Sequence, residues 1–289
     1  MGVKRQVFGS LAERNFDYQL SKQWSKNNHI YHNLPFLNIF YIDDQLIKKI
    51  EITDNQIDYL KKTSIDFTLC NNQDEPLICI EFDGMQQGFN VGNKYYCNNN
   101  INNLRKKSFE LKLKIAHSLS FPFVVVSSNE FQYLSNDIKL CIVDGIIVQA
   151  ISYQVFESEM KQVFNPHKYG MTEEEFLELP LKEQYYFVKK DCLHIEVDTY
   201  FNNNPVFQKA SKLHESLGDP SYSLKPVKGI NFHIYHGRQS TINLKEYGIV
   251  EAEIILPKFD VPKLYMGSLV DEISRLLACN KAIKFMQNF

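Results

Sequence analysis

Three acidic residues have the types and the spacing that metal-assisted chemistry requires. Glu81 and Asp83 end an apolar run that starts at Leu77, and Asp66 lies in an earlier apolar run over residues 65–69. Both runs are rich in β-branched and aromatic residues and are separated by a polar segment, which predicts a β-hairpin. Because strand side chains alternate, Glu81 and Asp83 share one face. A symmetric hairpin places Asp66 opposite Glu81 on that face.

Such a hairpin gathers three carboxylates at one point, where they repel each other unless a divalent cation lies between them. A hard cation in this position holds a phosphate oxygen and a water molecule together, lowers the pKa of the water and stabilises charge on phosphorus. The alternative is that the acids lie on a solvated hairpin face. Apolar residues on both faces of the run that ends at Glu81 indicate a central strand, which favours a site.

These residues carry a resemblance to a known superfamily. Asp66, the stretch Ile80-Glu81-Phe82-Asp83-Gly84, the basic segment after it and the run 121–126 resemble the PD-(D/E)XK nucleases, most closely their Vsr-like branch. The resemblance covers about residues 9 to 131 through short motifs. It implies a restriction-endonuclease-like fold, a mixed sheet flanked by helices, and a phosphodiesterase that uses Mg²⁺, with Mn²⁺ able to substitute, on DNA rather than RNA. Asp66 and Glu81 would hold the metal.

The chain departs from the superfamily pattern at two positions. The usual Lys after Glu-x is Asp83, as in the Vsr-like branch, where it would be a further ligand or a water positioner. The His of that branch falls on Gln87. A Gln side chain can hold water or a phosphate oxygen, but it cannot take up a proton near neutral pH. Three alternatives stay open: another group is the base, a metal-bound hydroxide suffices, or the protein is weak or inactive.

Glu13 is a further candidate metal ligand. Ser10 is a good N-cap and Glu13 follows at capping-box spacing, on the apolar face of a predicted helix that includes Phe16 and Leu20. Members of the superfamily often supply a Glu from their first helix to the metal. A capping box alone also explains Glu13, and both interpretations stay open.

A basic helix is predicted from Asn102 to Leu119. It carries Arg105, Lys106, Lys107 and Lys112, which we expect to contact nucleic-acid phosphates. In the resembled family a Lys on this helix faces the site, and Lys112 is the best positional match, so Lys112 and Gln87 would steady the phosphate or water. A solvated face of an amphipathic helix is the alternative for any one of these residues.

Composition limits the class of protein. The chain has 289 residues, 44% of them hydrophobic, and a net charge of -2, which argues against a general DNA-coating role but allows a local basic helix. The six Cys residues lie neither in CxxC pairs nor at zinc-finger spacing. With no signal-like segment and no apolar run of membrane length, the sequence predicts an intracellular, cytoplasmic protein in a reducing compartment, without a membrane partner.

The chain divides in two by pattern, and the expected fold class is α/β (α+β). Residues 1–164 form the predicted nuclease domain, with helices over 10–26 and 53–62, strands over 29–42, a hairpin over 64–83, a long polar loop over 84–100 and a strand over 121–127. Residues 165–289 form a C-terminal α+β domain with strands at 230–235 and 249–256 and a last helix from 268 to 286. Its role would be substrate selection, homodimer formation or binding of a protein partner.

Three functional hypotheses follow. The first is a metal-dependent endonuclease acting in restriction, anti-phage defence, repair or mobile-element processing. The second is a catalytically inactive nuclease-fold module that binds nucleic acid or a protein partner. The third is an unrelated α+β enzyme in which the acidic residues are incidental.

Overall fold

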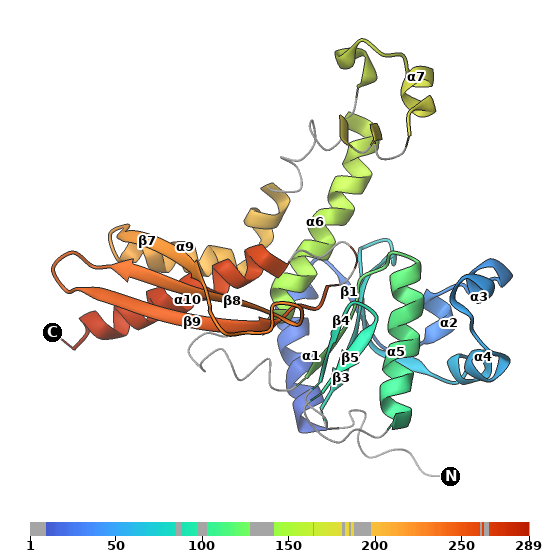
Figure 1. Cartoon of the computed structure of the whole chain (residues 1–289), viewed down its shortest axis with the longest axis horizontal. Helices are drawn as coiled ribbons and strands as arrows, with labels where there is room; N and C mark the ends of the chain where they lie inside the picture. Colours follow the sequence, from blue (N-terminus) through green and yellow to red (C-terminus); the bar gives the residue numbers. More distant parts are fainter. Residues whose placement is uncertain are drawn as a thin grey trace.

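A computed structural model describes residues 10–84, 88–97, 103–127, 142–163, 165–180, 183–184, 186–187, 198–260, 262 and 266–288, without the side chains of 156–163. The fold is mixed α/β, as the sequence predicted. It contains a four-stranded mixed sheet and, further along the chain, a three-stranded antiparallel sheet packed on a helix (Figure 1).

The first sheet has the strand order β1-β2-β3-β6, formed by β1 (His29–Pro35), β2 (Ser64–Cys70), β3 (Pro76–Asp83) and β6 (Phe123–Ser127). The first three strands are antiparallel, and β6 joins β3 in parallel after the crossover helix α5 (Asn103–Ser118). Phe67 pairs with Ile80, so the next step of the register sets Asp66 across from Glu81. The predicted hairpin is therefore present, with β3 as a central strand buried on both faces.

Two helical layers cover this sheet. On one face lie α1 (Leu11–Trp24) and α6 (Ile142–Val163), and Phe16, Leu20 and Trp24 of α1 are buried there. Ser10 caps α1 as predicted, with its hydroxyl accepting from the Glu13 backbone N–H at 3.1 Å. The opposite face is covered by α5 and by three short helices, α2 (Phe36–Ile39), α3 (Asp44–Ile50) and α4 (Asp54–Leu60).

Two predictions about the first half were wrong. The expected strand 29–42 stops at Pro35 and continues as α2, because Phe36 and Phe40 stand four residues apart and stack on each other in the core at 4.6 Å. The expected polar loop 84–100 contains a second hairpin of β4 (Phe89–Val91) and β5 (Lys94–Tyr96). Phe89 and Tyr95 are buried, so these aromatic residues fold back on the core.

The second half begins with a 3₁₀ turn, η2 (Pro166–Tyr169), and α7 (Glu173–Glu178), which has a capping box at Thr172. After α9 (Pro205–Ser216) come β7 (Ser221–Pro226), β8 (Tyr235–Asn243), β9 (Ile249–Pro257) and α10 (Met266–Met286). The strand predicted at 230–235 starts only at Tyr235, because Ile234 and Tyr235 both donate backbone hydrogen bonds to Asn231 in a turn. β7 was not predicted.

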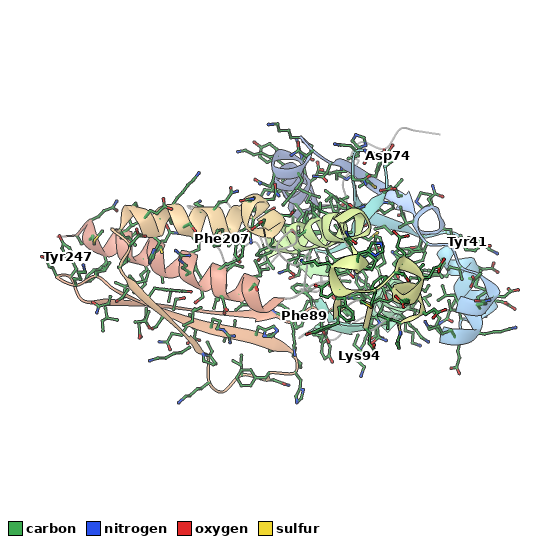
Figure 2. The ribbon with its side chains drawn as sticks, turned by 90° about the horizontal axis from the view of Figure 1, so that it is seen from above. Tyr41, Asp74, Phe89, Lys94, Phe207 and Tyr247 are labelled. Carbon is green, nitrogen blue, oxygen red and sulfur yellow. The ribbon has the colours of Figure 1, made fainter. Side chains whose placement is uncertain are left out.

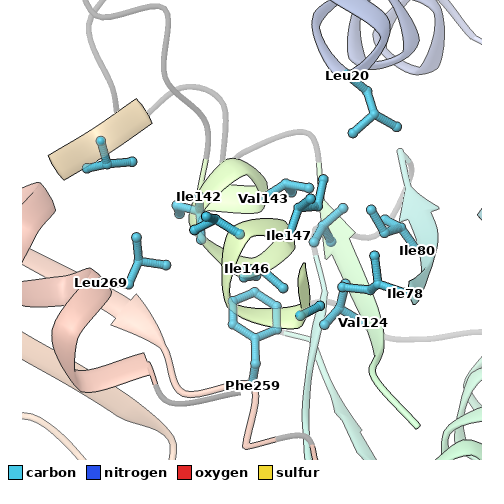
Figure 3. Close-up of a cluster of buried hydrophobic side chains, with 14 of the residues drawn as sticks. Leu20, Ile78, Ile80, Val124, Ile142, Val143, Ile146, Ile147, Phe259 and Leu269 are labelled. Carbon is cyan, nitrogen blue, oxygen red and sulfur yellow. The ribbon is translucent and has the colours of Figure 1, made fainter. Parts of the chain in front are cut away.

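One hydrophobic core joins the two halves. α6 lies between the two sheets (Figure 1), and Figure 2 shows the sheet β7-β8-β9 with α9 and α10 at one end of the molecule. In Figure 3, Ile142 and Ile146 of α6 lie among Val124 of the first sheet, Phe259 and Leu269. Residues before and after position 164 therefore pack into the same hydrophobic core. None of the described helices is both long and apolar enough to cross a membrane.

Candidate functional site

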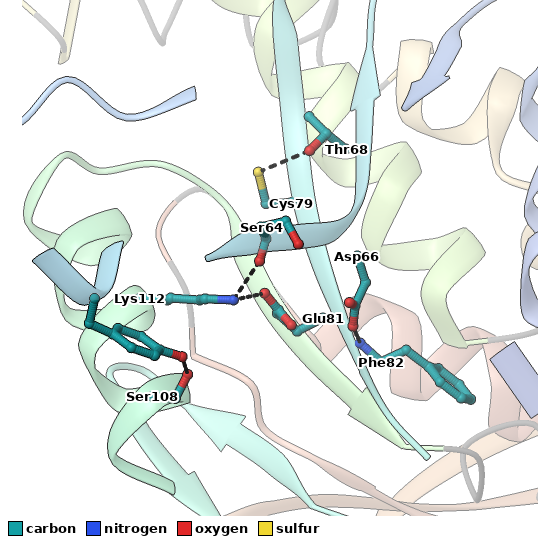
Figure 4. A network of polar contacts seen from close by, with 9 residues as sticks. Ser64, Asp66, Thr68, Cys79, Glu81, Phe82, Ser108 and Lys112 are labelled. Carbon is teal, nitrogen blue, oxygen red and sulfur yellow. Dashed lines mark hydrogen bonds and ion pairs between the residues drawn. The ribbon is translucent and has the colours of Figure 1, made fainter. Parts of the chain in front are cut away.

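Lys112, Glu81 and Asp66 lie close together, each on a different element (Figure 4). The Lys112 ammonium of α5 donates to the Glu81 carboxylate of β3 and, at 2.7 Å, to the Ser64 backbone carbonyl at the start of β2. Asp66 of β2 accepts from the Phe82 backbone N–H at 2.9 Å through one oxygen. Because α5 crosses over the face to which Glu81 points, the sequence-distant Lys112 reaches the hairpin.

The Asp66 and Glu81 carboxyl groups form a close pair. They are hydrogen-bonded to each other, and burial is the main cause that raises the pKa of Glu81 to about 8, with the Asp66 charge adding to it and Lys112 opposing it. Glu81 and Lys112 are about 95% buried, whereas Asp66 is half-buried. At neutral pH the Glu81 carboxyl is therefore mostly protonated.

Asp83 lies on the same strand face, but its carboxylate is occupied. One oxygen pairs with the Arg105 guanidinium at 3.0 Å, and the other accepts from the Tyr95 hydroxyl and from the Gly88 backbone N–H at 3.3 Å. Asp83 is fully buried. These donors fix the second hairpin and the first turn of α5 against the end of β3, so the geometry gives Asp83 an anchoring role.

The predicted convergence of three carboxylates is thus a pair in the structure. Within the described ranges, no group of three or more His, Cys, Asp or Glu side chains is arranged to hold a metal ion. The physical reason is that the Arg105 guanidinium and the Tyr95 hydroxyl already bind the Asp83 carboxylate. Asp83 therefore does not need a metal ion to offset repulsion from the other two carboxylates. Asp66 and Glu81 remain, and two adjacent carboxylates fit a hard cation that completes its shell with water and substrate oxygens.

The basic residues of α5 divide into inward and outward sets. Arg105 and Lys112 point to Asp83 and Glu81. Lys106 forms an exposed ion pair with Glu110 at 3.8 Å, and Lys107 is exposed. Of these four basic residues, only Lys106 and Lys107 lie on the surface, where the sequence predicted contacts with nucleic-acid phosphates.

Glu13 and Gln87 are the two remaining predicted site residues. Glu13 lies on α1, which packs on the other face of the sheet, although the α1 N-terminus approaches the end of β3: a Cβ on Gly84 would be 3.6 Å from the Ser10 hydroxyl. Gln87 lies outside the described residues.

Two groups in the site were missed from the sequence. Tyr95 binds Asp83, and the Ser64 carbonyl binds Lys112. A backbone carbonyl leaves no sequence signal, and Tyr95 stood in a segment that read as a loop. Cys70, Cys79, Cys97 and Cys279 form no disulfide among the described residues, and Cys70, Cys79 and Cys279 are buried.

Comparison of the chain with protein-family models, with curated proteins and with solved structures finds no match.

Proposed function

We propose that the protein is a metal-dependent phosphodiesterase, a nuclease that acts on DNA more readily than on RNA. The observation that carries this proposal is the meeting of Asp66, Glu81 and Lys112: two carboxylates and one ammonium, delivered by β2, β3 and α5. Two carboxylates suit a Mg²⁺ or Mn²⁺ ion, and a fixed ammonium suits a phosphate oxygen beside it. Intracellular roles in restriction, anti-phage defence, repair or mobile-element processing fit this chemistry.

The topology supports the proposal. A first helix, three antiparallel strands, a crossover helix and a parallel fourth strand follow in the order that the resemblance to PD-(D/E)XK nucleases implies. In that arrangement the acids sit on the two middle strands. The position of the usual Lys after Glu-x is taken by Asp83, while Lys112 supplies an ammonium to the same carboxylate from α5.

Each residue has a separate part in the proposed chemistry. Asp66 and Glu81 would hold the metal, which when bound supplies positive charge and an acidified water. Lys112 holds Glu81 in place and presents a positive charge to a phosphate oxygen. Asp83 keeps Arg105 and Tyr95 in position at the edge of the site.

A cleavage assay tests the proposal. Supercoiled plasmid, single-stranded DNA and RNA are incubated with the protein and Mg²⁺ or Mn²⁺, with EDTA as the metal-free arm. We expect nicking that EDTA abolishes and that Asp66→Asn or Glu81→Gln lowers by at least about 100-fold, because even second-shell changes at metal sites cost roughly 10–100-fold.

Asp58→Asn is the matched control. Asp58 is an exposed carboxylate that pairs with Lys61 at 2.8 Å on the surface, so its loss leaves cleavage unchanged. Circular dichroism shows whether each variant is folded. Cleavage that survives in both Asp66→Asn and Glu81→Gln would belong to a contaminant or another site and would refute the assignment.

One observation favours a second candidate, an inactive nuclease-fold module. Glu81, Lys112 and Asp83 are almost wholly buried. A buried ion pair such as Lys112–Glu81 can hold two elements of the fold together without any part in catalysis. A folded protein that binds DNA but neither cleaves it nor binds Mg²⁺ would be this module.

A further inference from the structure

A cavity of about 330 Å³ opens at the other end of the β2–β3 hairpin from Glu81. Four segments that are distant in the sequence form it: the end of α1, the turn between β2 and β3, the middle of α6 and the helical segment 198–203. At the lower end of the usual volume range for small-molecule sites, it suits a single small ring system.

The lining of this cavity is polar but carries no charge. None of the described residues that line it is ionisable, and most of them bear a carboxamide. A carboxamide offers two donor hydrogens and an acceptor oxygen. The lining therefore favours a neutral ligand with both donors and acceptors, and it offers no cation for a phosphate or a carboxylate.

Some of these carboxamides only stabilise the fold. Asn28 donates to the Trp24 carbonyl, Asn203 donates to the Thr199 carbonyl, and Asn71 is engaged with Gln73 and Glu75 within the turn. These three are fixed walls of the cavity.

The side-chain carboxamides of five other lining residues make no hydrogen bond in the part of the chain that the structure describes: Gln23, Asn27, Asn72, Gln73 and Gln154. Gln154 is half-buried and the other four lie exposed at the cavity rim. They come from α1, the turn and α6, so an entering molecule meets donors and acceptors from three sides. Such side chains give a ring-shaped ligand several partners at once.

The floor of the cavity is apolar. It is made by Trp24, Leu77, Ile151 and Val155. The Trp24 indole N–H donates to Asp144 at 2.9 Å, which fixes the ring in the wall. A flat molecule with apolar faces and a polar edge matches an apolar floor with a carboxamide rim, and a nucleobase is such a molecule. Asn and Gln side chains pair with base edges in a bidentate manner, most favourably with adenine.

We infer that this cavity binds an uncharged nucleobase, presented by a free nucleoside or by an unpaired nucleotide of a polynucleotide. The inference does not depend on the hydrolase proposal, because the cavity lies at the turn end of β3 and Glu81 lies near its other end.

Ligand-detected NMR by saturation transfer, followed by calorimetric titration, tests this inference with the full chain. The probes are adenosine, guanosine, cytidine and thymidine, a short oligonucleotide with one unpaired adenine, the same duplex fully paired, and ribose. We expect saturation transfer to the base protons of at least one nucleoside or to the unpaired adenine. Binding of a nucleoside identifies the free source, and binding of the bulged oligonucleotide alone identifies the polynucleotide source.

Variants locate the bound base. Asn72→Ala and Gln154→Ala should each weaken binding by about tenfold, as expected for loss of one hydrogen bond. Gln73→Ala, on the exposed turn, is a third cavity variant that leaves the core untouched. Gln19→Ala is the matched control, because Gln19 is an exposed α1 residue outside the lining, and it should leave binding unchanged.

Three results would overturn the inference. They are no transfer to any base, ribose binding as well as the nucleosides, or affinities that stay the same in all three cavity variants. None of these results bears on plasmid cleavage, so the two proposals fail separately.

Discussion

Lys112 of α5 joins β2 and β3 by donating to the Glu81 carboxylate and, at 2.7 Å, to the Ser64 carbonyl. We expect Lys112→Met to lower the free energy of unfolding by roughly 1–3 kcal/mol, since two hydrogen bonds to buried acceptors are lost while Glu81, mostly protonated at neutral pH, is not left as an unpaired charge. Cleavage should fall by about 100-fold. Urea denaturation and the plasmid assay measure the two effects.

The matched control for this change lies two residues away. Lys114 also donates to a backbone carbonyl, that of Ile50. Lys114→Met should therefore cost stability in the same way but leave cleavage intact. Equal loss of cleavage in both variants would mean that Lys112 acts only through the fold.

Metal binding should release a proton from the Asp66–Glu81 pair. Burial raises the pKa of Glu81 to about 8, so this carboxyl is mostly protonated at pH 7 and must ionise to hold a cation. Affinity for Mg²⁺ should rise with pH up to about 8 and then level off. Calorimetry at pH 7 in buffers of different ionisation enthalpy should give about one proton per ion, and Glu81→Gln should abolish the release. Binding without a buffer-dependent enthalpy would contradict the assignment.

Asp83 should behave as an anchor. Asp83→Ala leaves the buried donors of Tyr95 and Gly88, and the partly exposed Arg105 guanidinium, without their acceptor, which should cost about 3–5 kcal/mol of stability. Tyr95→Phe removes a single donor and should cost about 1 kcal/mol. Thermal denaturation measures both. If the folded Asp83→Ala protein binds Mg²⁺ far more weakly than the wild type at the same pH, Asp83 is a metal ligand and the anchoring role is wrong.

Glu272 should make stability depend on pH. This buried α10 carboxylate accepts from Tyr200 at 2.9 Å and from Asn204 at 2.6 Å, and burial raises its pKa to about 7. A carboxyl whose pKa is higher in the folded state contributes stability that is complete below its unfolded pKa and is lost as pH rises through about 7. Stability should fall by up to about 3 kcal/mol from this group between pH 5 and pH 8.

Glu272→Gln separates this effect from others. The amide keeps an acceptor for Tyr200 or Asn204 but cannot ionise. The variant should lose stability at pH 5 but show a smaller decline toward pH 8. A pH slope identical to that of wild type would rule out Glu272 as its source.

Gly145 should be required for the contact between α6 and α10. A Cβ at this position would be 2.1 Å from the Leu269 Cδ1 atom. Gly145→Ala, which in an exposed helix gains up to about 1 kcal/mol, should here cost roughly 1–3 kcal/mol through overpacking. The double change Gly145→Ala with Leu269→Ala should cost less than the sum of the two single changes in a double-mutant cycle. Additive effects would mean that the helices adjust without strain.

Local sequence determined much of this fold. Alternating and β-branched runs predicted β2, β3 and β6, and the cap Ser10 marked the start of α1, because capping and strand periodicity depend on neighbours within a few residues. The same reasoning placed Asp66 across from Glu81, since a hairpin register follows from its turn. It failed at α2 and at the hairpin β4–β5, where burial of Phe36, Phe40 and Tyr95 against distant residues decided the structure.

The candidate site depended on tertiary structure. The sequence supplied Asp66, Glu81, Asp83 and the basic helix, but only the crossover of α5 over β3 decided that Lys112 meets Glu81 and that Arg105 takes Asp83. Ion pairs between residues more than twenty positions apart are chosen by packing, which local patterns do not contain. The core that α6 shares with α10, and the neutral cavity at the far end of the hairpin, have the same origin: segments distant in sequence brought together by burial of apolar surface.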